Sequence, residues 1–116
     1  MHMNNEITTG ELEKLLIENP DIQIVDVREK NEWDMIRIPG AKLIPVSSIQ
    51  FRVEEIDFSA PVYLLCRSWG RSGRIAEWLK EEWKNAINIQ GGIKELYQNK
   101  SKTIEITDIF SSTYFL

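Results

Sequence analysis

The sequence predicts one α/β domain, in which a central parallel sheet is flanked on both faces by helices to give three layers. Short apolar stretches of strand length alternate along the chain with segments whose apolar residues recur at helical spacing. Polar, turn-forming residues follow the apolar stretches, as expected where buried parallel strands end. The 116 residues, of which 42% are hydrophobic, are enough for one domain with its own core.

The first part of the chain is expected to form a helix, a buried strand and a second, shorter helix. Thr8 and Glu11 have the spacing of a capping box, and the leucine stripe that follows is expected to end at Asn19-Pro20. Residues 22–27 are apolar and end in polar residues, which predicts a strand. Residues 29–35 are a charged helix candidate.

A turn, a short strand and an amphipathic helix are expected next. Pro39-Gly40 favours the turn, and residues 42–46 have the length and composition of a short strand. Ser47 is a candidate cap for a helix that continues to Ile56, because the apolar residues of this segment are spaced for one helix face.

The centre of the chain predicts a third strand and the longest helix. Residues 61–65 are the most apolar stretch, and a proline is tolerated at the first position of a strand. Residues 71–84 have helical spacing, and their row of Ile75, Leu79 and Trp83 is expected to face the core. The pattern is completed by a strand at residues 86–89, a turn at Gly91-Gly92 and a short helix at residues 93–98.

The domain is expected to span residues 1–100, with residues 101–116 as a C-terminal tail. Residues 103–106 alternate in polarity and could add an edge strand. The rest of the tail is too apolar for a plain disordered segment, so it is expected to pack on the domain or on a second copy.

A ligand site is expected where the predicted strands end, because ligands bind open parallel sheets outside the carboxyl ends of their strands. Asp26, Cys66 and the turn after Ile89 lie at such ends. The most informative stretch is Cys66-Arg67-Ser68-Trp69-Gly70-Arg71-Ser72, which leads from the apolar third strand into the longest helix.

The order of strand, loop and helix start predicts an anion-binding cradle around Cys66. The backbone N–H groups of the loop and of the first helical turn lack intrahelical partners, and the helix dipole adds positive potential there. Arg67, Arg71 and Arg74 act in the same direction and favour a reactive thiolate. A lone cysteine can also be a small buried hydrophobe, and the arginines can be a solvated helix start. The combination favours Cys66 as a nucleophile.

Composition narrows the possible functions. The formal net charge of −4 argues against general nucleic-acid binding, so the arginines near Cys66 are a local feature. The single histidine, His2, makes Ser-His-Asp and Cys-His catalysis poor candidates, and no metal-ligand spacing or nucleotide-binding glycine motif occurs, so no cofactor is expected. No apolar run is long enough to cross a membrane, and the N-terminus lacks a signal-peptide pattern; a cytoplasmic location is therefore expected.

The residues together resemble the single-domain rhodanese-like sulfurtransferases. The likeness covers roughly residues 7–97 and rests on the order and spacing of several stretches. These are Ile24-Val25-Asp26-Val27-Arg28-Glu29, Glu32-Trp33, Ile38-Pro39-Gly40-Ala41, Ile44-Pro45, Cys66-Arg67-Ser68-Trp69-Gly70-Arg71-Ser72 and Gly91-Gly92-Ile93.

The resemblance implies transfer of sulfane sulfur through a persulfide on Cys66. A small anionic donor such as thiosulfate would supply the sulfur, a thiol or cyanide would accept it, and a sulfur-accepting protein is a further candidate partner. The same resemblance implies that Arg67, Ser68, Trp69, Gly70, Arg71 and Ser72 form the substrate cradle. It also implies that Asp26 and Arg28 support the site structurally.

Departures from the family pattern leave two alternatives open. Trp69 occupies a position that is often glycine in the family, so a positive φ there would be strained and its indole could line or gate the site. The cysteine phosphatases use a similar cradle but place their arginine one residue further along than Arg71, where this chain has Ser72. A non-catalytic binding or persulfide-carrier module is the second alternative, and turnover of a small acceptor would distinguish it from an enzyme.

Overall fold

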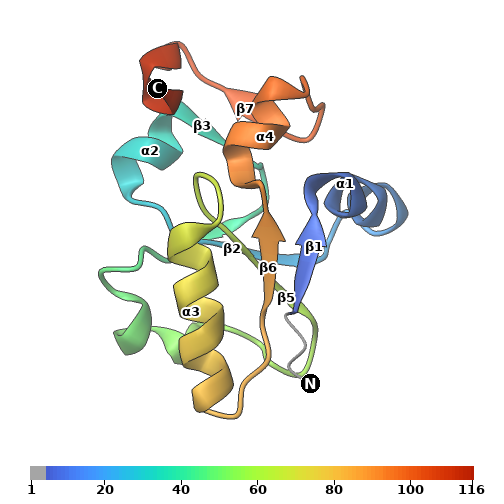
Figure 1. The fold of residues 1–116 in the computed structure, drawn as a ribbon, viewed down its shortest axis with the longest axis vertical. Helices are drawn as coiled ribbons and strands as arrows, with labels where there is room; N and C mark the ends of the chain where they lie inside the picture. Colours follow the sequence, from blue (N-terminus) through green and yellow to red (C-terminus); the bar gives the residue numbers. More distant parts are fainter. Residues whose placement is uncertain (1–4) are drawn as a thin grey trace.

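The computed structural model describes residues 5–116, so His2 lies outside the described residues. The main sheet contains β1 (Glu6–Thr8), β2 (Gln23–Asp26), β4 (Lys42–Leu43), β5 (Val62–Leu65) and β6 (Ile87–Gln90) (Figure 1). A small second sheet pairs β3 (Ile36–Arg37) with β7 (Glu105–Ile106). The α-helices are α1 (Thr9–Glu18), α2 (Lys30–Met35), α3 (Gly70–Glu81) and α4 (Gly92–Gln98). Short 3₁₀ helices lie at Ile49–Phe51, Val53–Glu55 and Ser112–Phe115.

The main sheet has the strand order β1-β6-β5-β2-β4, and all of its strand pairs are parallel. The predicted α/β fold with a parallel sheet is therefore confirmed. β5 lies at the centre of the sheet, and its last residue, Leu65, is in register with Asp26 at the end of β2. This register brings the polar residues that follow both strands to the same edge of the sheet.

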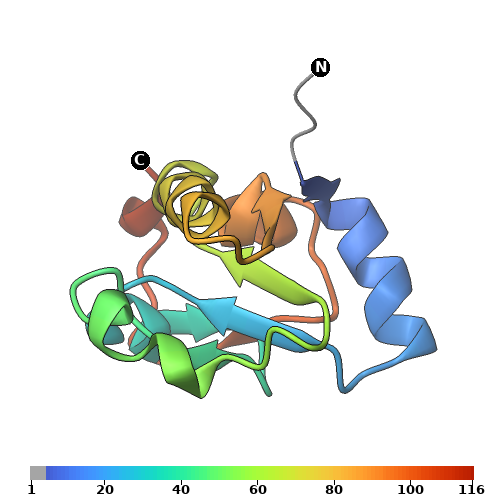
Figure 2. The ribbon, with the colours of Figure 1, turned by 90° about the horizontal axis from the view of Figure 1, so that it is seen from below.

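Both faces of the sheet are covered, because successive side chains of each strand point to opposite faces and pack against different helices. Val62 and Leu64 of β5 belong to a core cluster shared with α3 and the first 3₁₀ helix, whereas Tyr63 and Leu65 belong to a second cluster shared with α1 and α4. Figure 2 shows α3 and the 3₁₀ segment on one side of the sheet and α1 on the other. The continuous apolar run of β5 is thus the mark of a strand buried on both faces.

Local sequence signals explain how the first two helices begin. Thr8 and Glu11 form the predicted capping box at the start of α1, with Glu11 N–H 3.1 Å from Thr8 Oγ1 and Thr8 N–H 2.8 Å from Glu11 Oε1. At α2, Glu29 and Glu32 form the same arrangement, in which Glu29 N–H donates to Glu32 Oε2 over 2.8 Å. These caps fix the entry of α2, which carries Glu32 toward the site.

Some elements of the structure differ from those predicted from the sequence. The predicted helix after Ser47 is a pair of 3₁₀ turns, closed by Arg52 N–H to Ile49 O and by Ile56 N–H to Val53 O, each 3.0 Å. Its apolar row still faces the core, since Ile49 and Ile56 are buried. The short strand β1 was not predicted; it pairs with β6 just before α1 begins.

Trp83 does not join the core row of α3; its side chain is 97% exposed. The helix ends in a Schellman cap, in which Lys84 N–H donates to Leu79 O over 2.8 Å and Trp83 N–H donates to Lys80 O over 3.0 Å. Trp83 occupies the left-handed position of this cap with φ 60° and so turns away from the sheet. The cap lets the chain reverse into β6 within a few residues.

The C-terminal tail packs on the domain. β7 pairs with β3 in the small antiparallel sheet rather than extending the main one. Phe110, Tyr114 and Phe115 contact the core cluster on the α1 and α4 face, and the rings of Phe110 and Phe115 each lie 5.1 Å from the ring of Tyr97. The tail therefore ends beside α2 and α4 (Figure 1).

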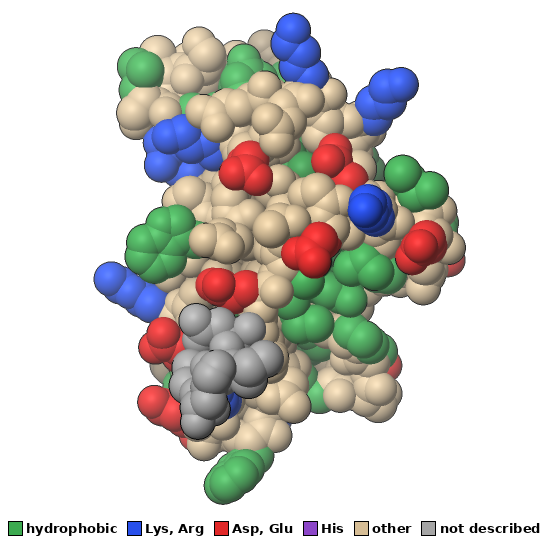
Figure 3. Space-filling model, turned by 45° about the vertical axis from the view of Figure 1, so that its right-hand side comes forward, with side chains coloured by type: hydrophobic (Ala, Val, Ile, Leu, Met, Phe, Trp, Pro, Cys, Tyr) green, Lys and Arg blue, Asp and Glu red, His purple; other side chains and the backbone are tan. Residues whose placement is uncertain are grey.

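The surface carries both signs of charge. On the face drawn in Figure 3, acidic and basic side chains are interspersed and leave apolar groups exposed between them. Within residues 5–116, no helix is long and apolar enough to span a membrane.

Candidate active site

Cys66 directly follows β5, and its burial follows from the alternation of that strand. It shares the α3 face with Val62 and Leu64 and is 1% exposed. Ser72, in the first turn of α3, lies on the same side, and its Oγ is 3.1 Å from Cys66 Sγ. The strand and the helix start therefore bring the thiol and a hydroxyl together at the base of the segment that we call the Cys66 loop, residues 66–72.

The backbone of the Cys66 loop is held from its carbonyl side. Ile93 N–H, at the start of α4, donates to Cys66 O over 3.1 Å, and Lys94 N–H donates to Arg67 O over 2.9 Å. Gly92 makes this approach possible, because it has φ 60° and a Cβ there would lie 2.6 Å from both carbonyl oxygens. The Gly91-Gly92 turn, which follows β6, thus allows the start of α4 to hold the backbone of the Cys66 loop in place.

The N–H side of the Cys66 loop is left open. α3 begins at Gly70, and Trp69 provides no side-chain cap for it. Its first backbone N–H groups have no intrahelical acceptor, and the helix dipole makes this end positive. Their position beside Cys66 favours an anion such as a thiolate or the terminal sulfur of a persulfide.

Trp69 fits the loop without left-handed strain, because its φ is −156°. Gly70 also needs no positive φ, so the shift of glycine by one residue relative to the family pattern does not strain the loop. The indole is 63% exposed and lines a cavity of about 270 Å³ beside α3, together with Gly70, Gly73 and Arg74. Cys66 is not among the residues that line that cavity.

Ser72 continues into a buried polar chain. Its hydroxyl donates to Asn88 Oδ1 over 2.5 Å and lies 3.3 Å from Trp69 O. Asn88 Nδ2 in turn donates to Glu6 Oε2 over 3.3 Å. The asparagine is a polar residue inside an apolar strand, and this signal in the sequence could have identified it as a neighbour of the site.

Asp26 and Arg28 form an ion pair with both side chains 0% exposed. Arg28 Nη2 lies 2.8 Å from Asp26 Oδ2, and Arg28 Nε lies 3.0 Å from Asp26 Oδ1. The guanidinium also donates to Ile36 O over 2.6 Å and so ties the end of β2 to β3. Burial by itself would lower the pKa of Arg28, but the hydrogen bonds and charge of Asp26 outweigh it and leave the pKa raised.

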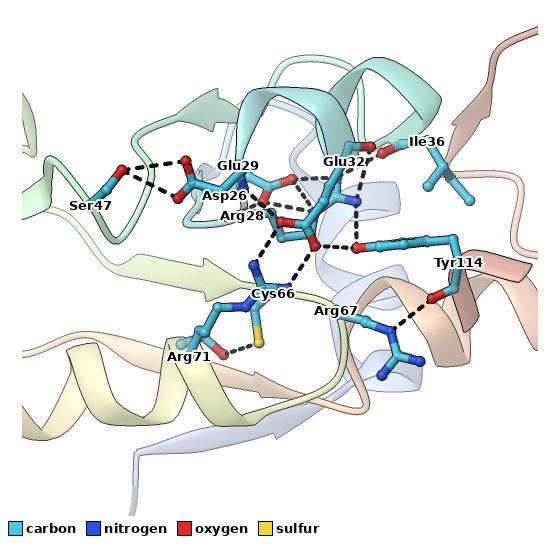
Figure 4. Close-up of polar contacts among 11 residues, drawn as sticks. Asp26, Arg28, Glu29, Glu32, Ile36, Ser47, Cys66, Arg67, Arg71 and Tyr114 are labelled. Carbon is cyan, nitrogen blue, oxygen red and sulfur yellow. Dashed lines mark hydrogen bonds and ion pairs between the residues drawn. The ribbon is translucent and has the colours of Figure 1, made fainter. Parts of the chain in front are cut away.

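Arg71 is paired with Glu32, a residue that the sequence did not single out for a role. Arg71 Nη1 and Nη2 donate to the two carboxylate oxygens of Glu32 over 2.7 and 2.8 Å, and Tyr114 Oη donates to Glu32 Oε1 over 2.7 Å (Figure 4). Burial would raise the pKa of Glu32, but the hydrogen bonds from Arg71, the backbone of Glu29 and Tyr114 lower it to about 2. The pKa of Arg71 is raised by the same hydrogen bond.

Arg67 is held by the tail. Its Nε donates to Tyr114 O and its Nη2 to Leu116 O, each over 3.1 Å. The guanidinium also lies 5.8 Å from the ring centre of Tyr114 and 6.0 Å from that of Phe115. Burial raises the pKa of Tyr114 to about 12, against a lowering effect of Arg28, so the phenol keeps its proton and remains a donor.

The structure brings most of the sequence-predicted site residues together, but with different partners from those expected. Cys66 and Ser72 are in contact, and Asp26 and Arg28 lie at the adjacent strand end. The side chains of Arg67 and Arg71 bind internal partners, whereas Ser68 is half-buried beside them. Among residues 5–116, no group of three or more His, Cys, Asp or Glu side chains could hold a metal ion.

Comparison with known proteins identifies this arrangement. The model of the rhodanese-like domain matches residues 8–99. The chain belongs to the rhodanese-like domain family. A rhodanese-like domain protein from Staphylococcus aureus has a crystal structure that superposes with a TM-score of 0.76 at 34% identity, covering 91% of this chain and 100% of that one.

Curated relatives agree with this rhodanese-like assignment. A sulfurtransferase from Allochromatium vinosum is 33% identical over 92 residues, which cover 78% of this chain and 86% of the relative. The uncharacterized protein YqhL of Bacillus subtilis is 43% identical over 74 residues, or 63% of this chain. The chain spans 59% of YqhL and 49% of another Bacillus subtilis relative, which is named a putative sulfur carrier protein.

Proposed function

We propose that this rhodanese-like domain is a sulfurtransferase that moves sulfane sulfur from a small donor to a thiol or cyanide through a persulfide on Cys66. The observation that carries the proposal is the position of the Cys66 thiol at the base of a loop whose free N–H groups lead into the N-terminus of α3. The Allochromatium relative, whose length is mostly covered, is named a sulfurtransferase and supports the same chemistry.

In the first step, the Cys66 thiolate attacks the outer sulfur of the donor. With thiosulfate, the S–S bond of the donor breaks, sulfite leaves with the electron pair, and Cys66 carries a persulfide anion. The free N–H groups of the Cys66 loop would stabilise the charge on the terminal sulfur, as an oxyanion hole stabilises oxygen. Ser72 Oγ lies 3.1 Å from Sγ, so its hydroxyl can turn its one proton from Asn88 Oδ1 to the thiolate before the attack.

In the second step, cyanide or a thiolate attacks the terminal sulfur, which leaves as thiocyanate or as a new persulfide, and the Cys66 thiolate is regenerated. Neither step requires a base, because the nucleophiles and leaving groups are anions. Asp26 and Arg28 would act structurally, by fixing the strand end beside the loop. A cytoplasmic location and a domain limit near residue 100 complete the proposal.

The direct test is the intact mass of the protein after incubation with thiosulfate, for the wild type and for Cys66→Ser. We expect the wild type to gain one sulfur atom and to lose it to cyanide with formation of thiocyanate. The serine variant should gain nothing. A wild type that gains no sulfur from thiosulfate or from a persulfide, although its thiol alkylates, would refute sulfur transfer.

A persulfide carrier that docks on a protein partner is the second candidate. It is favoured by the exposed indole of Trp69 beside the cavity along α3, since exposed aromatic side chains are common at protein interfaces. A carrier would take up one sulfur but would not turn over with a small acceptor. Multiple turnovers with cyanide at a rate proportional to enzyme would exclude this candidate.

A further inference from the structure

The charge around the Cys66 loop is smaller than its arginines imply. Near the loop, the guanidinium groups of Arg28 and Arg71 pair with the carboxylates of Asp26 and Glu32, whereas the guanidinium of Arg67 is held by the tail. The Asp26 pair and the Glu32 pair are each neutral as units. Arg67 has no carboxylate side chain as its partner, and its guanidinium donates instead to Tyr114 O and Leu116 O.

The tail controls two of these groups, although it lies outside the family domain. The rhodanese-like match ends at residue 99, whereas both acceptors of Arg67 come from Tyr114 and Leu116. The hydroxyl of Tyr114 donates to Glu32, the carboxylate that binds Arg71. A segment added to the domain thus determines where both loop arginines point.

We propose that residues 114–116, together with Glu32, make the site selective for persulfide donors, R–S–S⁻, over the thiosulfate dianion. This inference rests on the proposed sulfurtransferase function. The tail withholds Arg67, and Glu32 neutralises Arg71, so the loop is left with the backbone N–H groups as its main anion-binding elements.

The charges of the two reactions explain the preference. Attack of the Cys66 thiolate on thiosulfate gathers three negative charges and releases sulfite with two of them. Attack on the terminal sulfur of R–S–S⁻ breaks the donor S–S bond, releases R–S⁻ and forms the Cys66 persulfide, with two negative charges throughout. A site with little net positive charge slows the reaction with thiosulfate more than the reaction with a persulfide, because the thiosulfate reaction brings together more negative charge that the site does not neutralise.

The first test compares kcat/KM of the wild type for thiosulfate and for the persulfide of 2-mercaptoethanol, whose only charge is that of the persulfide. We expect the persulfide to be the better donor by at least about tenfold, since one missing charge-assisted hydrogen bond has an effect of this size. Equal use of both donors, or a preference for thiosulfate, would overturn the inference while leaving sulfur transfer intact. Failure with both donors would instead refute the proposed function.

Two variants test the role of the tail and of Glu32. Deletion of residues 114–116 removes both acceptors of Arg67, and Glu32→Gln removes the charge that neutralises Arg71 without altering the tail. Each should raise the ratio of thiosulfate to persulfide kcat/KM by about tenfold and make the thiosulfate rate fall more steeply with added salt. Glu32→Gln decides the outcome if the deletion lowers the melting temperature below the assay range.

Ile109→Ala is the matched control, because Ile109 lies in the same tail, is 61% exposed and is not a hydrogen-bond partner of Arg67 or Arg71. It should leave the donor ratio and the salt dependence unchanged. A folded Glu32→Gln variant with the wild-type donor ratio would refute the proposal, as would a control that shifts the ratio as much as the two test variants do.

Discussion

Replacing Asp26 should destabilise the protein more than any other single change of charge at the site. Asp26→Ala leaves Arg28 charged, 0% exposed and without its carboxylate. Removing one partner of a buried ion pair typically costs about 3–5 kcal/mol. Arg28 would keep its bond to Ile36 O at 2.6 Å and its weaker contacts to Glu32 O and Tyr114 Oη, so we expect the lower end, about 3 kcal/mol.

Thermal unfolding followed by circular dichroism measures this effect. For a domain of this size, about 1 kcal/mol corresponds to about 4 °C, so the melting temperature should fall by about 12 °C. Asp34→Ala is the matched control, because Asp34 pairs with Lys30 on the surface and such pairs contribute only about 0–1 kcal/mol. If Asp26→Ala lowered the melting temperature no more than Asp34→Ala, the buried pair would not support the fold as we argue.

Three further predictions follow from individual contacts. Gly92→Ala should destabilise the fold far more than Gly40→Ala, because both glycines have positive φ but only at Gly92 would a Cβ meet backbone oxygens, at 2.6 Å; equal melting temperatures for the two variants would contradict this. Ser72→Ala should slow alkylation of Cys66 by iodoacetamide about fivefold, because it removes one hydrogen bond to the thiolate, of about 1 kcal/mol. An unchanged rate would show that the hydroxyl does not activate the thiol. Because the pKa of Glu32 is lowered from 4.5 to about 2, its contribution to stability is complete above pH 4.5 and is lost as the pH falls toward 2. Glu32→Gln should therefore flatten the decline of the melting temperature over that range, and an identical decline would show that the carboxylate does not contribute.

The parts of the site that local sequence specifies could be predicted. Cys66 ends a strand that is apolar on both faces, and the loop after it leads directly into a helix, so its position follows from neighbouring residues. The same holds for the capping box of Thr8 and Glu11, in which both partners lie within one turn. The parallel direction of the strands could also be predicted, because helices separate most of the strands along the chain.

The partners of long charged side chains could not be predicted, because they are chosen in three dimensions. Arg71 and Glu32 are 39 positions apart in the sequence, and Arg28 and Tyr114 are 86 apart. The arginines near Cys66 therefore suggested an open positive surface, whereas the folded chain gives Arg67 and Arg71 internal partners. Trp83 shows a second limit, because the cap that reverses the chain after α3 overrides the apolar row to which this residue belongs.

The structural support of the site by Arg28 can be separated from the tail, because Arg28 contacts the core and the tail with different nitrogens. Nε and Nη2 bind Asp26 and Ile36 O at 2.6–3.1 Å, within the buried core. Only Nη1 reaches Tyr114 Oη in the tail, over a longer distance of 3.3 Å. Loss of the tail contact would leave the guanidinium with its carboxylate and its backbone acceptor, so the strand ends beside Cys66 would stay in place. The tail is thus able to alter which donor the site accepts without dismantling the loop that holds the reacting sulfur.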